Sequence, residues 1–434
     1  EGKSLGRGNA KREKKKKIFP AVYLLHFSVK RIHDEKRKKA VHIVYVTPEF
    51  ITEKSGGGLA SYIANISQIL ASYGHRISII TLSEKKDERF VWKDRIAVYR
   101  VSDVSRVSLT QLKRLLLSHR LYLCVKRLEK KEKIDLIQYA SFEGVGFFHL
   151  RNVPAVVRIS SDCVAWREYK VYDYDKTKLR PCLTDWLEYH AEKKIGNIFG
   201  PSYATAGLIE QRTHRKVTVI ESPFYLKKET FDTSVFDSIL EGKKYYLSHS
   251  SMSCLKGTHV IAEIIADICK KDKTAYFVFA GADHGIFYKN GTVISAKEYI
   301  LKHAGVYADR VIFLGTLERQ KLYPVIEGAF ACLMPSRIDN MPNTCIEAMA
   351  MGKIVVGTRG ASYEQLIEDG RNGFLIEIDS REGLKNAIYR IEVLTKEERK
   401  VIESEARKTT ERFNAENVYY QLMSFYKTVI EKSD

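Results

Sequence analysis

The sequence lacks any uninterrupted apolar run of the roughly 18 residues that a membrane-spanning helix needs. Of its 434 residues, 44% are hydrophobic and 29% are charged, as in ordinary folded proteins. The chain is longer than one compact core supports, and its length predicts two or three domains. We therefore expect a globular protein with several domains.

Cysteine is scarce, and the seven cysteines are scattered singly along the chain. They form no C-x-x-C pair and no spacing with histidine that is typical of a metal site. This pattern argues against a disulfide framework and a zinc site, and is typical of buried thiols in a reducing compartment. We expect a cytoplasmic protein.

Acidic residues are few in residues 1–40, which hold 14 Lys and Arg against 4 Asp and Glu and so carry about half of the net charge of +19. Within this segment, the twelve mostly apolar residues IFPAVYLLHFSV are too few for a span and suit a membrane surface. We predict that 1–40 is a basic extension, disordered or at the inner membrane face, with 11–39 attracted to anionic lipid. Because the chain begins with Glu1 rather than Met, a second interpretation stays open, in which the extension is not native. We expect no nucleic-acid partner.

From residue 42 onward, short apolar runs alternate with amphipathic segments. Apolar residues recur at helical spacing between 59 and 73, between two apolar runs, which predicts a βαβ unit. Such units predict a mostly parallel sheet covered on both faces. Strands are expected at 42–47, 76–82, 95–101, 134–140, 154–160 and 217–222. This first domain is predicted at residues 41–223.

The same alternation restarts after a polar stretch and predicts a second domain at 224–413. Its strands are expected at 245–250, 275–281, 310–315, 330–335, 353–358 and 373–378, and one helix is expected to carry Val260, Ile261, Ile264, Ile265 and Ile268. A last helix, 414–434, presents an apolar stripe that we expect to pack on the first domain. The fold class is thus α/β, with two Rossmann-like doubly wound domains that face each other across a cleft.

Two junctions between a strand and a helix carry candidate binding residues. The run SGGGLASY includes Gly57 and Gly58 before the first helix, where a backbone can approach a phosphate and helix amides can bind it. At the matching junction of the second domain, Lys256 precedes Gly257 and could neutralise an anionic ligand. Taken alone, a flexible glycine loop and a solvated surface lysine explain these features as well.

The stretch RIDNMPNTCIEAMAMG, residues 337–352, is the most informative. Pro342 suits a first helical turn and Gly352 suits the position after a helix, so we predict a helix from Pro342 to Met351. Asp339 then lies in a loop and Glu347 in the second turn, and both can face one ligand. Carboxylates accept from hydroxyls, and first-turn amides near Asn343 and Thr344 donate to oxygens, which indicates a polyhydroxylated anionic ligand.

This stretch resembles the E-x7-E region of the glycogen-synthase-like, retaining family 4 glycosyltransferases. Further motifs of the resemblance are TPEF, the glycines at 56–58, Lys256-Gly257, AGAD, VIFLGTL, AMAMGKIVVGT and EDGRNGFLI, so it covers about residues 42–430. The resemblance implies a GT-B fold and a nucleotide diphosphate sugar held mainly by the second domain. It also implies a hydroxyl acceptor on the first domain, which we expect to be a glycan, a lipid-linked molecule or a polysaccharide precursor, and transfer with retention at the anomeric carbon. No metal and no cofactor are expected.

The resemblance also implies roles for residues at matching positions. Glu347 would hold the nucleotide ribose, Asp339 the donor sugar hydroxyls, and Lys256 the departing diphosphate, which makes these three the predicted catalytic residues. The other residues expected to bind the donor are Gly57, Gly58, Ser251, Asn340, Met341, Pro342, Asn343 and Thr344. On the acceptor side we expect Glu143, Arg158, Ser160 and Asp162.

Three departures from the family pattern stand out. Asp339 occupies the place of the usual first Glu, and Ser250 and Ser251 stand where the family commonly has an Arg. A hydroxyl cannot supply the charge of a guanidinium, so another cation is needed, and His249 is one candidate. Ser160 and Ser161 stand where many members have a histidine.

The D-x-D sequence at Asp173 has no strand before it and is interpreted as chance.

Two alternatives to a sugar transferase remain at this point. The first is a sugar-nucleotide epimerase or a phosphorylase on the same fold, because fold does not fix the reaction. The second is a basic binding protein with weakened catalysis, which the charge and the missing Arg suggest.

Overall fold

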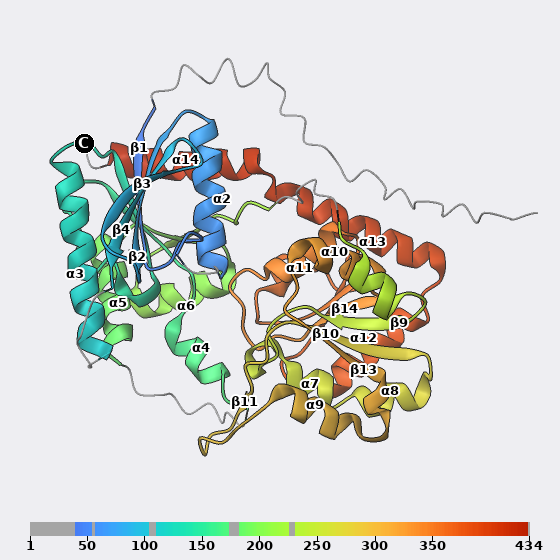
Figure 1. Ribbon diagram of the computed structural model, residues 1–434. Helices are drawn as coiled ribbons and strands as arrows, with labels where there is room; N and C mark the ends of the chain where they lie inside the picture. Colours follow the sequence, from blue (N-terminus) through green and yellow to red (C-terminus); the bar gives the residue numbers. More distant parts are fainter. Residues whose placement is uncertain (1–39, 54–56, 104–109, 173–181, 225–230, 433–434) are drawn as a thin grey trace, which may run out of the picture. The chain divides into compact units, whose positions relative to one another are not determined.

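The computed structural model describes residues 40–53, 57–103, 110–172, 182–224 and 231–432 (Figure 1). The predicted basic extension, and with it the proposed lipid-binding segment 11–39, falls outside these residues apart from residue 40. Within the described part of the chain, no helix combines the length and the apolar character that crossing a membrane requires.

The first half of the chain, blue to green in Figure 1, forms an eight-stranded sheet in the order β3-β4-β2-β1-β5-β6-β7-β8. Neighbouring strands are parallel except β3 with β4, which confirms the predicted mostly parallel sheet. The strands are β1 (His42–Thr47), β2 (Arg76–Ser83), β3 (Glu88–Trp92), β4 (Ile96–Ser102), β5 (Leu136–Ala140), β6 (Ala155–Arg158), β7 (Ile198–Gly200) and β8 (Val217–Val219). The helices are α2 (Gly58–Ser72), α3 (Thr110–Glu129), α4 (Cys163–Tyr169), α5 (Leu183–Ile195) and α6 (Tyr203–Thr213).

Two strands of this sheet were not predicted from the sequence. Among the described strands, β3 pairs with β4 alone; it is an edge strand and mostly exposed, so its sequence ERFVW lacks a buried apolar run. Strand β7 has three residues, and these lie between Gly and Pro in IGNIFGPS. Both strands are defined by their neighbours in the sheet rather than by their own apolar pattern.

The second half, yellow to orange in Figure 1, forms a six-stranded parallel sheet in the order β13-β10-β9-β14-β15-β16. Each of its strands lies within a predicted run or overlaps it. The strands are β9 (Lys244–Ser248), β10 (Ala275–Ala280), β13 (Val311–Gly315), β14 (Ala331–Met334), β15 (Val355–Thr358) and β16 (Phe374–Ile376), beside a small hairpin of β11 (Ile286–Phe287) and β12 (Val293–Ile294). The helices are α7 (Thr258–Ala262), α8 (Ile265–Lys271), α9 (Ala296–Ala304), α10 (Arg319–Gly328), α11 (Asn343–Ala350), α12 (Arg381–Glu392), α13 (Lys396–Thr410) and α14 (Ala415–Glu431).

The single helix predicted to carry Val260 to Ile268 is two helices, α7 and α8, so that prediction was wrong. The amide of Ile264 bonds to the carbonyl of Ile261, three residues back, instead of continuing the α-helical pattern. All five predicted apolar residues are nevertheless buried in the core of the second half.

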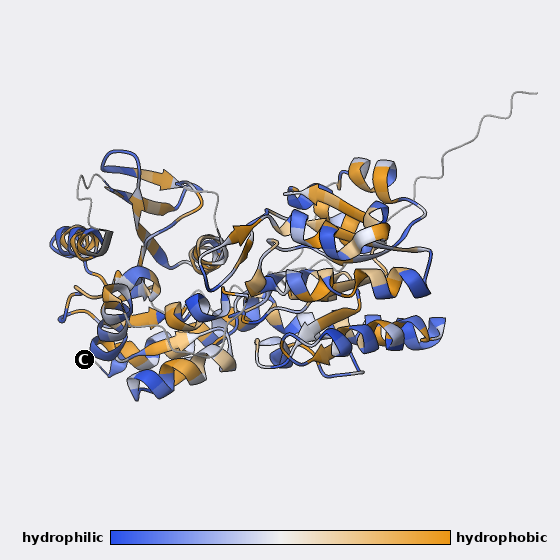
Figure 2. Ribbon diagram, turned by 90° about the horizontal axis from the view of Figure 1, so that it is seen from below, coloured by the Kyte–Doolittle hydropathy of each residue, from blue (hydrophilic) through white to orange (hydrophobic). Residues whose placement is uncertain are grey.

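The last helix, α14, packs on the first half, as the apolar stripe predicts. The ring of Tyr419 stacks on Tyr73 with centroids 3.7 Å apart, and its hydroxyl lies 3.0 Å from Nε2 of His75. The hydroxyl of Tyr426 donates to Gln138 on the central strand β5. Helix α14 therefore completes the hydrophobic core of the first half, and in Figure 2 the strands of both halves are mainly hydrophobic.

Candidate functional site

The stretch RIDNMPNTCIEAMAMG forms a loop followed by a short helix. Helix α11 begins at Asn343, one residue later than predicted, because Pro342 has a ψ of 86° and precedes the first helical turn. Gly352 follows the helix with a φ of 70°, which glycine adopts without strain. Asp339 lies in the loop after β14, and Glu347 lies in the second turn of the helix. The two acids therefore come from different elements.

Both acids line a pocket of about 400 Å³, which we call the cleft pocket. Its walls come mostly from loops that follow strands of both sheets, where ligands of parallel sheets bind. Eight predicted site residues line it: Gly58, Arg158, Ser160, Asp339, Asn340, Met341, Asn343 and Glu347. Seven predicted residues do not line it: Gly57, Glu143, Asp162, Ser251, Lys256, Pro342 and Thr344.

Lys256 reaches the cleft pocket through its contact with Asp339. It ends the 3-10 turn Cys254–Lys256, and Gly257 follows with a φ of 69°. A Cβ at Gly257 would lie 1.8 Å from the carbonyl oxygen of Pro335, so only glycine lets this turn approach the loop after β14. The Nζ of Lys256 lies 2.5 Å from Oδ2 of Asp339. The structure thus joins two of the three predicted catalytic residues in one ion pair.

Glu347 has a partner that sequence reasoning missed. Nε of Arg319, at the start of α10, lies 3.5 Å from Oε1 of Glu347. Burial raises the pKa of the Glu347 carboxyl, and the Arg319 guanidinium opposes this shift. Arg319 directly follows the motif VIFLGTLE and lies at the junction of β13 and α10, as Lys256 lies at the junction of β9 and α7. This position in the sequence could have identified Arg319 as a candidate site residue.

Two helix N-termini meet at the cleft pocket. Gly58 begins α2 and Asn343 begins α11, and a Cβ at Gly58 would lie 3.8 Å from the side-chain nitrogen of Asn343. No described side chain caps either helix. First-turn amides at both helices are therefore available to ligand oxygens, and both helix dipoles favour a negative charge.

Asn340 connects the loop after β14 to the first half of the chain. Its side-chain nitrogen donates to the carbonyl of Ser160 at 2.8 Å, and its side-chain oxygen accepts from the Ser202 hydroxyl at 3.1 Å. Its backbone amide donates to Oδ1 of Asp339. Asn340 therefore fixes Asp339 and holds the loop against the ends of β6 and β7.

His249 cannot serve as the missing cation. It is fully buried, and burial lowers the pKa of its imidazole to about 4, so the ring is neutral at pH 7. Its Nε2 lies 3.1 Å from the carbonyl oxygen of Thr344, which fixes Nε2 as the protonated nitrogen. Ser251 lies on the loop after β9, outside the cleft pocket, and the suggestion that His249 compensates for it was wrong.

Two of the predicted acceptor-side residues have local partners away from the cleft pocket. Asp162 caps α4 by accepting from the amide of Ala165 at 2.8 Å, and it pairs with Arg212 at 2.7 Å. Glu143 lines a neighbouring hollow and lies 3.4 Å from Arg114. Arg158 and Ser160 are thus the two acceptor-side predictions that the structure places at the cleft pocket.

The predicted D-x-D decoy at Asp173 lies outside the described residues. Among the residues that are described, no group of three or more His, Cys, Asp or Glu side chains is arranged to hold a metal ion. The sequence expectation that no metal takes part stays a prediction.

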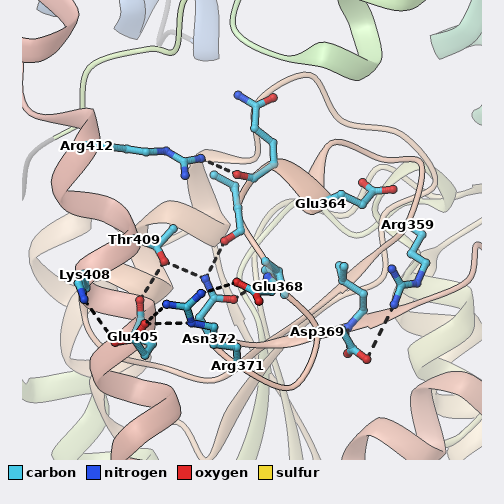
Figure 3. A pocket seen from close by; sticks show the side chains of 14 residues that line it. Arg359, Glu364, Glu368, Asp369, Arg371, Asn372, Glu405, Lys408, Thr409 and Arg412 are labelled. Carbon is cyan, nitrogen blue, oxygen red and sulfur yellow. Dashed lines mark hydrogen bonds and ion pairs between the residues drawn. The ribbon is translucent and has the colours of Figure 1, made fainter.

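A second pocket, of about 740 Å³, is lined in part by residues of the motif EDGRNGFLI, and we call it the charged pocket (Figure 3). Its arginines pair with neighbouring acids: Arg371 lies 2.7 Å from Glu368 and 3.0 Å from Glu405, and Arg359 lies 3.8 Å from Asp369. The motif thus belongs to a wall of paired charges that packs the turn before β16 against α13, and it does not line the cleft pocket.

Comparisons with known proteins agree with this fold. Residues 243–392 match the model described as Glycosyl transferases group 1, and residues 56–225 match the model described as Glycosyltransferase Family 4. Among curated protein sequences, no match to the chain was found.

Solved structures with the same fold include enzymes of sugar metabolism. Sucrose-phosphate synthase from Thermosynechococcus elongatus superposes with a TM-score of 0.70 at 16% identity, over 90% of this chain and 100% of that one. HepE from Anabaena, in complex with UDP and glucose, gives 0.63 at 16% identity, over 89% and 100% of the two chains. The catalytic domain of starch synthase IV from Arabidopsis thaliana, bound to ADP and acarbose, gives 0.64 at 13% identity, over 91% and 100%.

The two family models cover successive halves of the chain and together more than half of its length. The structural neighbours share its two-domain α/β architecture at low sequence identity. The chain therefore belongs to the GT-B glycosyltransferases of the family 4 type.

Proposed function

We propose that this glycosyltransferase moves a hexose from a nucleotide diphosphate sugar to a hydroxyl acceptor, with retention of the anomeric configuration. The acceptor would be a glycan, a lipid-linked molecule or a polysaccharide precursor. We also propose that residues 11–39 attach the protein to the inner membrane face. These residues lie outside the described part of the chain.

One observation carries this proposal: two acids and two uncapped helix starts converge on the cleft pocket. Asp339 and Glu347 supply acceptors for hydroxyl groups, as sugar and ribose recognition requires. The starts of α2 and α11 supply donors and a positive potential for phosphate oxygens. A nucleotide diphosphate sugar combines these two kinds of group in one molecule.

The structural neighbours support a nucleotide sugar as donor. HepE was solved with UDP and glucose, and starch synthase IV with ADP and acarbose. These neighbours contain different bases, so the base and the sugar of the donor are left open in the proposal.

In the proposed reaction, the bond between the anomeric carbon and the diphosphate oxygen breaks. The acceptor oxygen forms a bond to the anomeric carbon on the same face. The acceptor proton passes to an oxygen of the leaving diphosphate. Lys256, which pairs with Asp339 at the pocket, would move toward the diphosphate as negative charge develops on the leaving group, because the ammonium is attracted to that charge. The helix N-termini would supply the remaining electrostatic stabilisation without any reorganisation.

The family matches do not favour the alternatives of an epimerase, a phosphorylase or a binding protein. Retention is tested separately, by determining the anomeric configuration of the first product by NMR before mutarotation. A product of inverted configuration would overturn the retaining part of the proposal and leave the glycosyl transfer in place.

The central experiment is a calorimetric binding screen of nucleotide sugars against the wild type, Asp339→Ala and Glu347→Ala. We expect one donor class to bind the wild type and both variants to bind it at least about tenfold more weakly, since each loses a charged hydrogen-bond acceptor. Glu405→Ala, in the charged pocket, is the matched control and should bind normally. If no donor binds the wild type, or if both site variants bind unchanged, the proposed function is wrong.

A further inference from the structure

The two fully buried arginines among the described residues differ sharply in their partners. Arg337 is 5% exposed and donates to Oδ1 of Asp379 at 2.8 Å and to the carbonyl of Tyr172 at 2.8 Å. Arg158 is 4% exposed and donates from Nη2 to the Ser222 hydroxyl at 2.9 Å. Its Nε is buried without a partner, and no described carboxylate forms an ion pair with it. Arg337 is therefore neutralised within the protein, whereas Arg158 is not.

A buried guanidinium without an acid is costly, because its charge has lost water and gained no counter-charge. The Tyr62 ring lies 3.5 Å below Cζ of Arg158, and this cation–π contact offsets part of the cost. The titratable groups that act most strongly on Arg158 are the hydroxyls of Tyr62, Tyr426 and Tyr45. These hydroxyls are neutral at pH 7, so they supply no counter-charge. Arg158 stays protonated nevertheless, since the guanidinium of arginine does not lose its proton in proteins.

Arg158 ends β6 and lines the cleft pocket, together with Ser160 and Ser222. The Ser160 hydroxyl is also buried, and no described residue forms a hydrogen bond with it. The guanidinium offers donors only, and both hydroxyls can donate. The hydrogen-bond donors at this side of the pocket therefore match an oxyanion, which would accept from all three side chains.

We propose that Arg158, Ser160 and Ser222 form an anion subsite in the cleft pocket, which binds a phosphate or carboxylate group of a substrate. The group comes either from the donor diphosphate, where the subsite supplies the positive charge that Ser251 cannot, or from an acidic acceptor. The inference rests on the proposed function insofar as the cleft pocket is taken as the place where donor and acceptor meet.

The test measures binding of inorganic phosphate and pyrophosphate by calorimetry at fixed ionic strength. Arg158→Gln should weaken binding by about 10- to 100-fold, because charge-assisted hydrogen bonds are lost, while Arg158→Lys should retain part of the affinity. Arg319→Gln is the matched control in the same pocket. Since Arg319 already pairs with Glu347, we expect a clearly smaller loss for this variant.

Ser160→Ala keeps the test decisive if Arg158→Gln does not fold. The Ser160 hydroxyl has no hydrogen-bond partner among the described residues, so its removal should leave thermal stability unchanged while phosphate binding weakens several-fold. The proposal is overturned if phosphate and pyrophosphate do not bind the wild type, or if the Arg158 and Ser160 variants bind them as the wild type does.

A second arm identifies the source of the anion. The wild type is saturated with the nucleoside diphosphate that it binds best, and inorganic phosphate is then titrated. Exclusion of phosphate assigns the subsite to the donor diphosphate, whereas continued binding that depends on Arg158 assigns it to an acidic acceptor. Anion binding through Arg158 without any sugar transfer would refute the proposed function alone, and sugar transfer with unchanged anion binding in the variants would refute the subsite alone.

Discussion

The cleft pocket and the charged pocket are both hollows lined by polar side chains, yet their charges are satisfied in different ways. In the charged pocket, Arg359 and Arg371 pair with neighbouring acids, and the buried Asn372 joins Leu366 to Thr409 (Figure 3). In the cleft pocket, Arg158 has no acid and two helix starts have no side-chain cap among the described residues. The arginines that line the larger hollow all pair with acids, whereas in the cleft pocket Arg319 pairs with Glu347 and Arg158 has no described acid, so unmet polar groups indicate a binding site better than volume does.

The largest expected effect separates the two pockets by activity. Lys256→Ala should reduce kcat/KM by about 10²- to 10³-fold, because the leaving diphosphate loses its positioned cation. Arg371→Ala, which removes a cation of the charged pocket, should leave kcat/KM unchanged. Initial rates with the donor found in the binding screen measure both. Equal losses in the two variants would contradict the distinction between the pockets.

The second prediction compares two buried asparagines, one in each pocket. Asn340→Ala should lower the unfolding free energy by about 1–3 kcal/mol, since the Ser160 carbonyl loses its donor, and it should also weaken donor binding. Asn372→Ala should cost a similar amount of stability and leave donor binding intact, because its contacts hold the charged pocket alone. Urea unfolding and calorimetry on the same samples give both quantities, and a loss of donor affinity in Asn372→Ala would break the comparison.

The third prediction concerns pH and the buried acid of the cleft pocket. Burial raises the pKa of Glu347, so its contribution to stability is greatest below the unfolded-state pKa and is lost as pH rises through the folded-state pKa. Donor affinity should instead rise with pH over this range, since the ribose hydroxyls need the ionised carboxylate as acceptor.

Glu347→Gln should flatten both of these pH dependences. Urea unfolding and donor titrations across the acidic to neutral range measure them. If donor affinity in the wild type falls as pH rises over this range, the assigned role of Glu347 is wrong.

The smallest effect is expected for the stability of Arg371→Ala. Arg371 lies at the surface, and exposed ion pairs contribute little because water and salt screen them. The melting temperature should therefore change little, and less than in Asn372→Ala. A larger change in the melting temperature of Arg371→Ala would show that the ion pairs of the charged pocket contribute substantially to stability.

Much of the fold was predictable because buried parallel strands are continuous apolar runs, as in His42–Thr47 and Ala275–Ala280. Strands β3 and β7 were not predictable, since one is exposed and the other has three residues. The split between α7 and α8 depends on one local hydrogen bond at Ile264, which an apolar pattern does not encode.

The candidate site was predictable where one segment contains the signal. Pro342 and Gly352 mark the limits of α11, and so they separate Asp339 from Glu347. The contact of Lys256 with Asp339 joins residues 83 positions apart through the close approach at Gly257, and no local pattern reports it. Whether a buried side chain such as Arg158 has a partner depends on every element around it, so it can be judged only in three dimensions.

Helix α14 has a consequence for how the protein is made. Its residues lie at the end of the sequence, yet Tyr419, Leu422 and Tyr426 belong to the core built on β1 and β5. During synthesis the first half emerges before α14 exists, so its apolar surface near Tyr73 stays uncovered until the second half has been translated. The core of the first half is thus completed only after the second half has been synthesised.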